Sequence, residues 1–169
     1  MTPEALAQLE ALADPGKAAE MAAYHKISRR YLGVSVPQVE ELVAEWRAEL
    51  ELDARVALAS GLWESNIHEA MVAAAKLLTQ ARIRPDEAVW DLICTWVPGF
   101  EGWAVADHAT IAAQKRLVAD PARIETVAGW TVSENMWTRR AALVITLPYA
   151  KMNFPKEQEL TLRERALGW

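Results

Sequence analysis

Two pairs of side chains in the sequence have the residue types and the spacing to act on a charged ligand. Trp103 and Asp107 lie four residues apart, so a helix would place them on one face. The face of an indole ring attracts positive charge, and a carboxylate stabilises that charge more strongly. The pair is therefore typical of a site for a cation. The alternative is a half-buried Trp103 beside a solvated Asp107 near a helix start, where the helix dipole favours an anion.

The second pair is Trp137 and Arg140, which are three residues apart and share a face in the same way. A guanidinium group binds phosphate through two parallel hydrogen bonds, so Arg140 is a candidate for holding a phosphate group. The alternatives are a solvated helix face and a salt bridge between neighbouring helices.

The elements that must position these residues are predicted to be helices, because apolar residues recur with the helical period along nearly the whole chain. Pro and Gly residues fall between the apolar stripes, where they end one helix and begin the next. The expected helices span residues 3–13, 17–29, 36–50, 53–61, 66–81, 85–96, 103–118, 121–129, 134–149 and 157–168.

Short helices with short connections predict an all-α fold, either a bundle or a helical solenoid. A weak internal repeat favours the solenoid: the segment that begins at Trp63 resembles the one that begins at Trp130, and Asn66 and Asn135 within them are 69 positions apart. With one further helix pair between them, each two-helix unit has about 35 residues, which lies in the range of helical hairpin repeats.

Composition excludes several classes of protein. A chain that is 52% hydrophobic and 24% charged is not expected to be disordered. The single cysteine, Cys94, excludes an intramolecular disulfide and a cysteine zinc site, and the three widely spaced histidines do not predict a metal site. No segment reads as a signal peptide or a membrane span, which predicts a cytoplasmic protein. Common phosphate-binding loops and the acyl-hydrolase elbow are absent.

The charge is unevenly distributed. The net charge of −5 taken alone disfavours a nucleic-acid partner. Residues 1–80 carry 7 basic and 12 acidic side chains, whereas residues 81–169 carry 11 of each. The second half can therefore present a basic patch that the total conceals.

Several stretches together give the sequence a specific resemblance. It resembles the DNA alkylation repair family, the AlkD-like helical-repeat DNA glycosylases. The stretches run in family order and together cover roughly residues 15–150; they are Ala23–Lys26 with Tyr31–Val34, Leu62–Ala70, Gly102–Asp107 and Ser133–Ala142.

The resemblance implies a right-handed α-solenoid of HEAT-like helical hairpins, here as a single domain over residues 1–169, whose concave face grips duplex DNA. It implies hydrolysis of the glycosidic bond of cationic bases such as 3-methyladenine and 7-methylguanine, without metal or organic cofactor. It places the family's catalytic aspartate on Asp107, a site tryptophan on Trp103, the site arginine on Arg140 and a DNA-contacting aromatic residue on Tyr24. Trp137 and Arg139 adjoin Arg140 and are also expected to contact DNA.

The sequence departs from the family at its end. Family members run some tens of residues further, and their second site tryptophan lies beyond the position of Trp169. The chain is therefore expected to lack the C-terminal repeats. Two other functions stay open: a relative that binds unusual DNA structures without releasing bases, and a helical-repeat scaffold for a protein partner.

Overall fold

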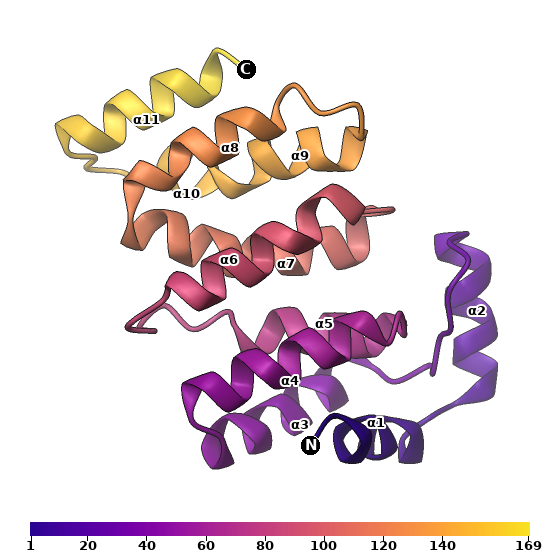
Figure 1. Cartoon of the computed structure of the whole chain (residues 1–169). Coiled ribbons are helices and arrows are strands. Elements are labelled where there is room, and N and C mark those ends of the chain that lie inside the picture. Colours follow the sequence, from indigo (N-terminus) through magenta and orange to yellow (C-terminus); the bar gives the residue numbers. More distant parts are fainter.

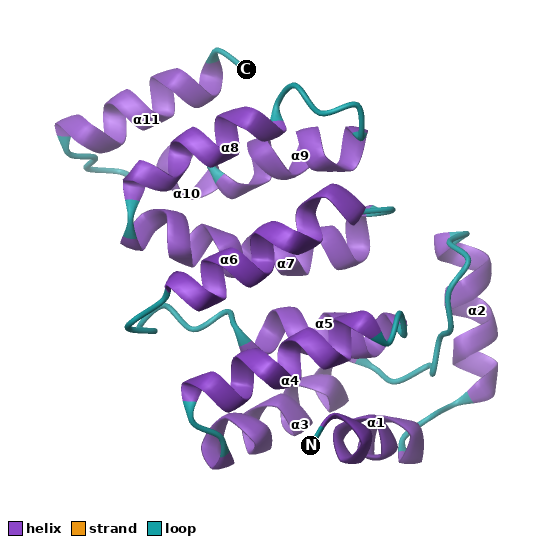
Figure 2. Cartoon of the chain, viewed as in Figure 1, coloured by secondary structure: helices purple, strands orange, loops and turns teal.

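The computed structural model describes all residues 1–169 and is helical without a β-strand, which confirms the all-α prediction (Figure 2). The elements are α1 (Thr2–Ala11), α2 (Pro15–His25), α3 (Val36–Glu49), α4 (Leu52–Glu64), α5 (His68–Leu77), α6 (Glu87–Trp96), α7 (Trp103–Ala119), α8 (Ile124–Trp130), α9 (Met136–Ile145), α10 (Leu147–Ala150) and α11 (Glu157–Leu167). Short 3-10 helices at Val97–Gly99 and Pro121–Arg123 precede α7 and α8.

The helices stack in chain order, from α1 to α3 at one end of the molecule to α11 at the other (Figure 1). One layer consists of α3, α5, α7 and α9, each of which packs against the next. On the other side of this layer, α4 packs on α5, α6 on α7 and α8 on α9. Helix α2 stands to one side of the stack, with its C-terminal end near the start of α7 (Figure 1).

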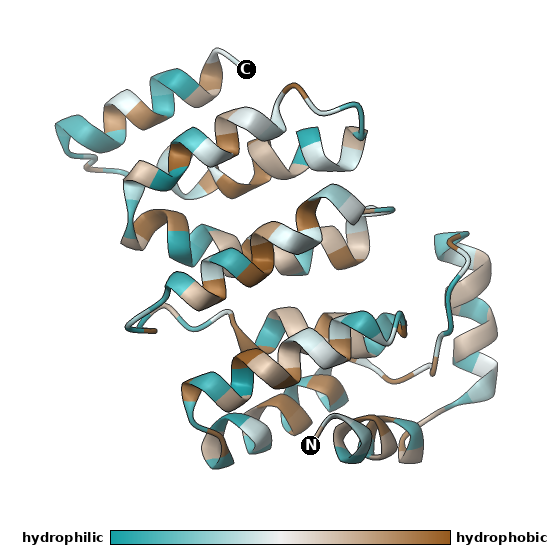
Figure 3. Cartoon of the chain, viewed as in Figure 1, coloured by the Kyte–Doolittle hydropathy of each residue, from teal (hydrophilic) through white to brown (hydrophobic).

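The two layers enclose one hydrophobic cluster of 39 buried residues that runs from Ala5 to Leu162. Hydrophobic and hydrophilic residues are interspersed along most helices of the stack, as expected for helices with one buried face (Figure 3). Helix α5 differs, because every residue in it except Lys76 is buried. Its run of alanines from Ala73 to Ala75 lets α3, α4 and α7 approach its backbone closely.

Several of the expected helices end earlier than the apolar pattern predicts, and two of them have a clear local cause. The helix expected over 17–29 ends at His25, because Lys26 takes a left-handed conformation with φ 56°. The helix expected over 134–149 breaks into α9 and α10 because Pro148 has no N–H to donate to the carbonyl of Val144. The side-chain amide of Gln114 on α7 donates to that carbonyl instead, at 2.7 Å.

The loop that follows α2 is fastened to the stack by a buried carboxylate. Glu69 is 2% exposed and accepts hydrogen bonds from the backbone N–H groups of Leu32 at 2.9 Å and Gly33 at 2.7 Å. Gly33 has φ +78°, and a Cβ there would collide with the carbonyl of Asp14 at the start of α2. The N–H of Asp14 donates to the carbonyl of Leu32 at 2.8 Å. These contacts fix the N-terminal end of α2.

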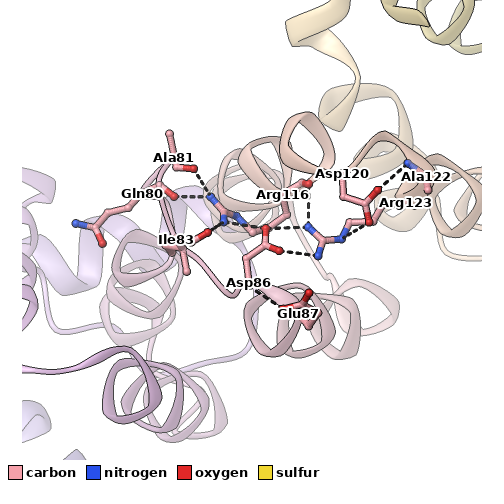
Figure 4. Close-up of polar contacts among 9 residues, drawn as sticks. All are labelled: Gln80, Ala81, Ile83, Asp86, Glu87, Arg116, Asp120, Ala122 and Arg123. Atoms are coloured by element: carbon pink, nitrogen blue, oxygen red, sulfur yellow. Dashed lines mark hydrogen bonds and ion pairs between the residues drawn. The ribbon is translucent and has the colours of Figure 1, made fainter.

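A second polar cluster fastens the loop between α5 and α6 (Figure 4). Asp86 lies between two guanidinium groups, 2.9 Å from Arg116 Nη1 and 2.8 Å from Arg123 Nη2. Arg116 is fully buried on α7 and also donates to the carbonyls of Gln80 at 2.5 Å and Ala81 at 3.1 Å. The hydrogen bond from Arg123 holds the pKa of Asp86 below its ordinary value, so the carboxylate stays charged. One carboxylate thus joins the start of α6 to α7 and to the 3-10 helix that precedes α8.

Candidate functional site

Asp107 and Arg140 come from neighbouring helices and meet as an ion pair. Nη2 of Arg140 lies 2.8 Å from Oδ2 of Asp107, and Nη2 and Nε lie 3.2 and 3.3 Å from its Oδ1. Both side chains are partly exposed, Asp107 at 32% and Arg140 at 46%. The pair joins the second turn of α7 to α9, and these two helices pack side by side. The interhelical salt bridge that the sequence left open as an alternative is therefore present, and it joins the two candidate charged residues to each other.

Trp103 lies one turn before Asp107, at the first residue of α7, and its side chain is 45% exposed. Tyr24, at the C-terminal end of α2, is 70% exposed and meets the indole edge to face, with ring centroids 6.3 Å apart. The structure thus brings two candidate aromatic rings to one place beside the candidate carboxylate. Large aromatic side chains this exposed are uncommon in a closed fold and are available to stack on a ligand.

The other two candidates have structural contacts. Trp137 is half-buried and packs against the hydrophobic cluster. Arg139 is exposed, and its Nη1 donates to the carbonyls of Ser133 at 2.6 Å and Glu134 at 2.9 Å in the loop before α9. These contacts position the start of α9, and they leave Arg140 as the member of this segment that meets Asp107.

The capping residue of α9 ties it to the segment before α7. The side chain of Asn135 accepts a hydrogen bond from the N–H of Trp137 at 2.9 Å and donates to the carbonyl of Phe100 at 2.8 Å. Phe100 lies three residues before Trp103. One side chain therefore sets the start of α9 relative to the start of α7, and with it the approach of Arg140 to Asp107.

Sequence reasoning did not assign a role to the histidines at this edge. His25 at the end of α2 stacks on His68 at the start of α5, with ring centroids 4.8 Å apart, and lies parallel to Tyr31 at 5.9 Å. His25 also contacts Trp103 at 5.7 Å. The only signal was that these residues fall inside the stretches that carry the family resemblance. Their contact depends on α2 folding back over the start of α5, which no local pattern predicts.

Burial controls the charge of both histidines. It is the main cause that lowers the pKa of His25 below its ordinary value, and the nearby Arg29 lowers it further. His68 is 7% exposed, and burial lowers its pKa from 6.5 to about 4, with smaller contributions from His25 and Arg29. Both rings are therefore neutral at neutral pH, which suits a stack of closely spaced rings.

The buried His68 predicts that acid destabilises the fold. The pKa of His68 is lower in the folded than in the unfolded protein, so between pH 6.5 and pH 4 the unfolded chain takes up a proton that the folded protein does not. The free energy of unfolding therefore decreases as the pH falls from 6.5 toward 4. The loss amounts to about 3 kcal/mol of unfolding free energy. The free energy of unfolding, measured with urea at a series of pH values, should depend less on pH in the His68→Phe variant than in the wild type. Parallel curves for the two proteins would contradict the assignment.

No group of three or more His, Cys, Asp or Glu side chains lies close enough to hold a metal ion. None of the helices is both long and apolar enough to cross a membrane.

One of the comparisons with known proteins confirms the family resemblance seen in the sequence. Searches of curated proteins and of solved structures gave no match. The family model described as "DNA alkylation repair enzyme" matches residues 5–169, which include the ion pair, both exposed aromatic rings and the helices that carry them. The chain belongs to the DNA alkylation repair enzyme family.

Proposed function

We propose that the protein is a DNA glycosylase that releases cationic alkylated bases, such as 3-methyladenine and 7-methylguanine, from duplex DNA. The observation that carries the proposal is the pairing of Asp107 with Arg140 at 2.8 Å, one helical turn from the exposed indole of Trp103. This arrangement fits a substrate with a positive base and a negative backbone. The carboxylate and the electron-rich ring attract positive charge, and the guanidinium beside them binds phosphate.

The reaction breaks the bond between the base nitrogen and C1′ of the deoxyribose. The departing base takes the electron pair of that bond and becomes neutral, which leaves oxocarbenium character on the sugar. Asp107 stabilises this cation and orients the water that adds to C1′ and loses a proton. Because the leaving base is already cationic, no general acid is required, and one carboxylate suffices. The proposal includes no metal or organic cofactor.

The ion pair gives the free protein a resting state. While Arg140 binds Asp107, the charge of the carboxylate is largely neutralised. A DNA phosphate competes with Asp107 for the guanidinium of Arg140. When Arg140 binds the phosphate instead, Asp107 is left free beside the sugar. Substrate binding would thus restore the negative charge at the place where the cation develops.

The fold proposed for this function is one domain over residues 1–169, a right-handed solenoid of HEAT-like helical pairs. Support comes from the serial packing of α3, α5, α7 and α9 and from the single hydrophobic cluster that runs through the chain. In this arrangement Asp107 and Arg140 occupy the face of the layer that meets DNA, with Tyr24 and Trp103 at its edge.

The test is release of bases from methylated duplex DNA. Purified protein is incubated with the duplex, and free 7-methylguanine and 3-methyladenine are separated and quantified against spontaneous loss without protein. Binding of undamaged duplex is measured in parallel over a range of salt concentrations. Release above the spontaneous rate supports the proposal, and absence of release despite binding contradicts it.

One observation favours a second candidate, a relative that binds DNA without releasing bases. Asp107 is engaged by Arg140 on both carboxylate oxygens, which is also how a purely structural ion pair is built. Salt-sensitive binding of duplex or branched DNA with no release of any methylated base would select this candidate.

A further inference from the structure

The C-terminal end of α2 meets the main body of the fold through a group of stacked aromatic rings. No residue of α2 is buried, and the hydrogen bonds that anchor it lie at its other end, near Asp14 and Gly33. At the C-terminal end His25 stacks on His68 at 4.8 Å and lies at 3° to the ring plane of Tyr31. Tyr31 and His68 in turn stack on each other at 5.0 Å. Both are buried and belong to the main body of the fold.

The same imidazole also contacts the exposed indole. Trp103 has two aromatic neighbours, Tyr24 edge to face at 6.3 Å and His25 tilted by 52° at 5.7 Å. Tyr24 precedes His25 in α2, so its own position follows that of the histidine. The N-cap of α7 is Gly102, and the side chain of Ile27 fills the place where a Cβ of that residue would lie. The imidazole therefore contacts both the buried stack and the two exposed rings of Tyr24 and Trp103.

We propose that His25 is a positioning residue, which holds Trp103 and Tyr24 in the orientation that the alkylated nucleotide requires. The inference rests on the proposed function where base release is measured. The test of the orientation of Trp103 does not depend on catalysis. A flat ring at position 25 is what the stack needs, because the imidazole lies at 3° to the ring of Tyr31 and at 27° to that of His68. A branched aliphatic side chain fills a similar volume but cannot stack on two faces.

The test uses His25→Phe and His25→Leu as a matched pair, with Glu20→Ala as the control. Glu20 is exposed on the same helix and has no partner in the site. Each protein is labelled with 5-fluorotryptophan, and the resonance of Trp103 is assigned by its loss in Trp103→Phe. We expect this resonance to keep its position in His25→Phe and Glu20→Ala, and to shift and broaden in His25→Leu. An unchanged resonance in His25→Leu overturns the proposal, whether or not the protein proves to be a glycosylase.

The activity readout separates positioning from general damage to the fold. At saturating protein, the single-turnover rate of 7-methylguanine release should fall about tenfold in His25→Leu and less than about twofold in His25→Phe. Affinity for undamaged duplex should change less than about twofold in both, because Arg140 is untouched. Equal losses of rate in the Phe and Leu variants would overturn the proposal. If the wild type itself releases no base, the proposed glycosylase activity fails while the resonance test still decides the role of His25.

Discussion

Replacing Asp107 with asparagine should reduce base release at least about 100-fold without weakening DNA binding. The amide keeps the shape of the carboxylate but removes the negative charge that would face the sugar cation. In the free protein it also removes the charged partner of Arg140, which lies 2.8 Å away. The guanidinium becomes more available to phosphate, and the protein surface becomes less negative. Affinity for duplex DNA is therefore expected to stay the same or to rise, while catalysis is lost.

This opposite response of rate and affinity distinguishes a catalytic carboxylate from a structural one. The ion pair is partly exposed, so its loss should cost less than about 1 kcal/mol of stability. A matched control is Asp53→Asn, which removes an exposed carboxylate from α4 that forms no ion pair in the structure. Release of 7-methylguanine and duplex binding are measured for all three proteins. Release by Asp107→Asn within about twofold of the wild type would refute the catalytic assignment.

The largest effect on stability is expected from Asp86→Ala. This substitution removes the carboxylate that pairs with Arg116, which is fully buried, and with Arg123, which is 8% exposed. Arg116 would then be left in the interior without a counter-charge, and Arg123 would keep only Asp120, whose Oδ2 lies 3.7 Å from its Nε. Removing one partner from a buried ion pair typically costs about 3–5 kcal/mol. For a chain of this size the midpoint of thermal unfolding should fall by roughly 10 °C.

The control for this prediction is Asp91→Ala, which removes an exposed aspartate from the same helix, α6. Surface substitutions of this kind change stability by about 0.5 kcal/mol or less. Thermal unfolding followed by circular dichroism compares the two variants directly. Similar midpoints for Asp86→Ala and Asp91→Ala would show that Arg116 and Arg123 find other partners. The backbone carbonyls of Gln80 and Ala81 already accept from Arg116, so they are the groups that would take over.

The amino-acid sequence is enough to predict that the protein is helical and where most of its helices lie. Apolar residues with a 3.6-residue period are sufficient for that, because burial of one helix face is a local property of the pattern. The same periodicity paired Trp103 with Asp107 and Trp137 with Arg140. The exceptions have local causes as well: Pro148 breaks the last predicted long helix, and Lys26 ends α2 in a left-handed conformation.

Which of these residues contact one another depends on the tertiary structure. Asp107 and Arg140 are 33 positions apart, and their contact depends on α7 and α9 packing side by side. Likewise, His25 reaches His68 and Trp103 because Glu69 holds the loop that turns α2 back over the start of α5. Spacing along one helix fixes which side chains share a face. Contacts between helices depend on loop conformation and on buried polar partners far away in the sequence, and a periodic pattern contains neither.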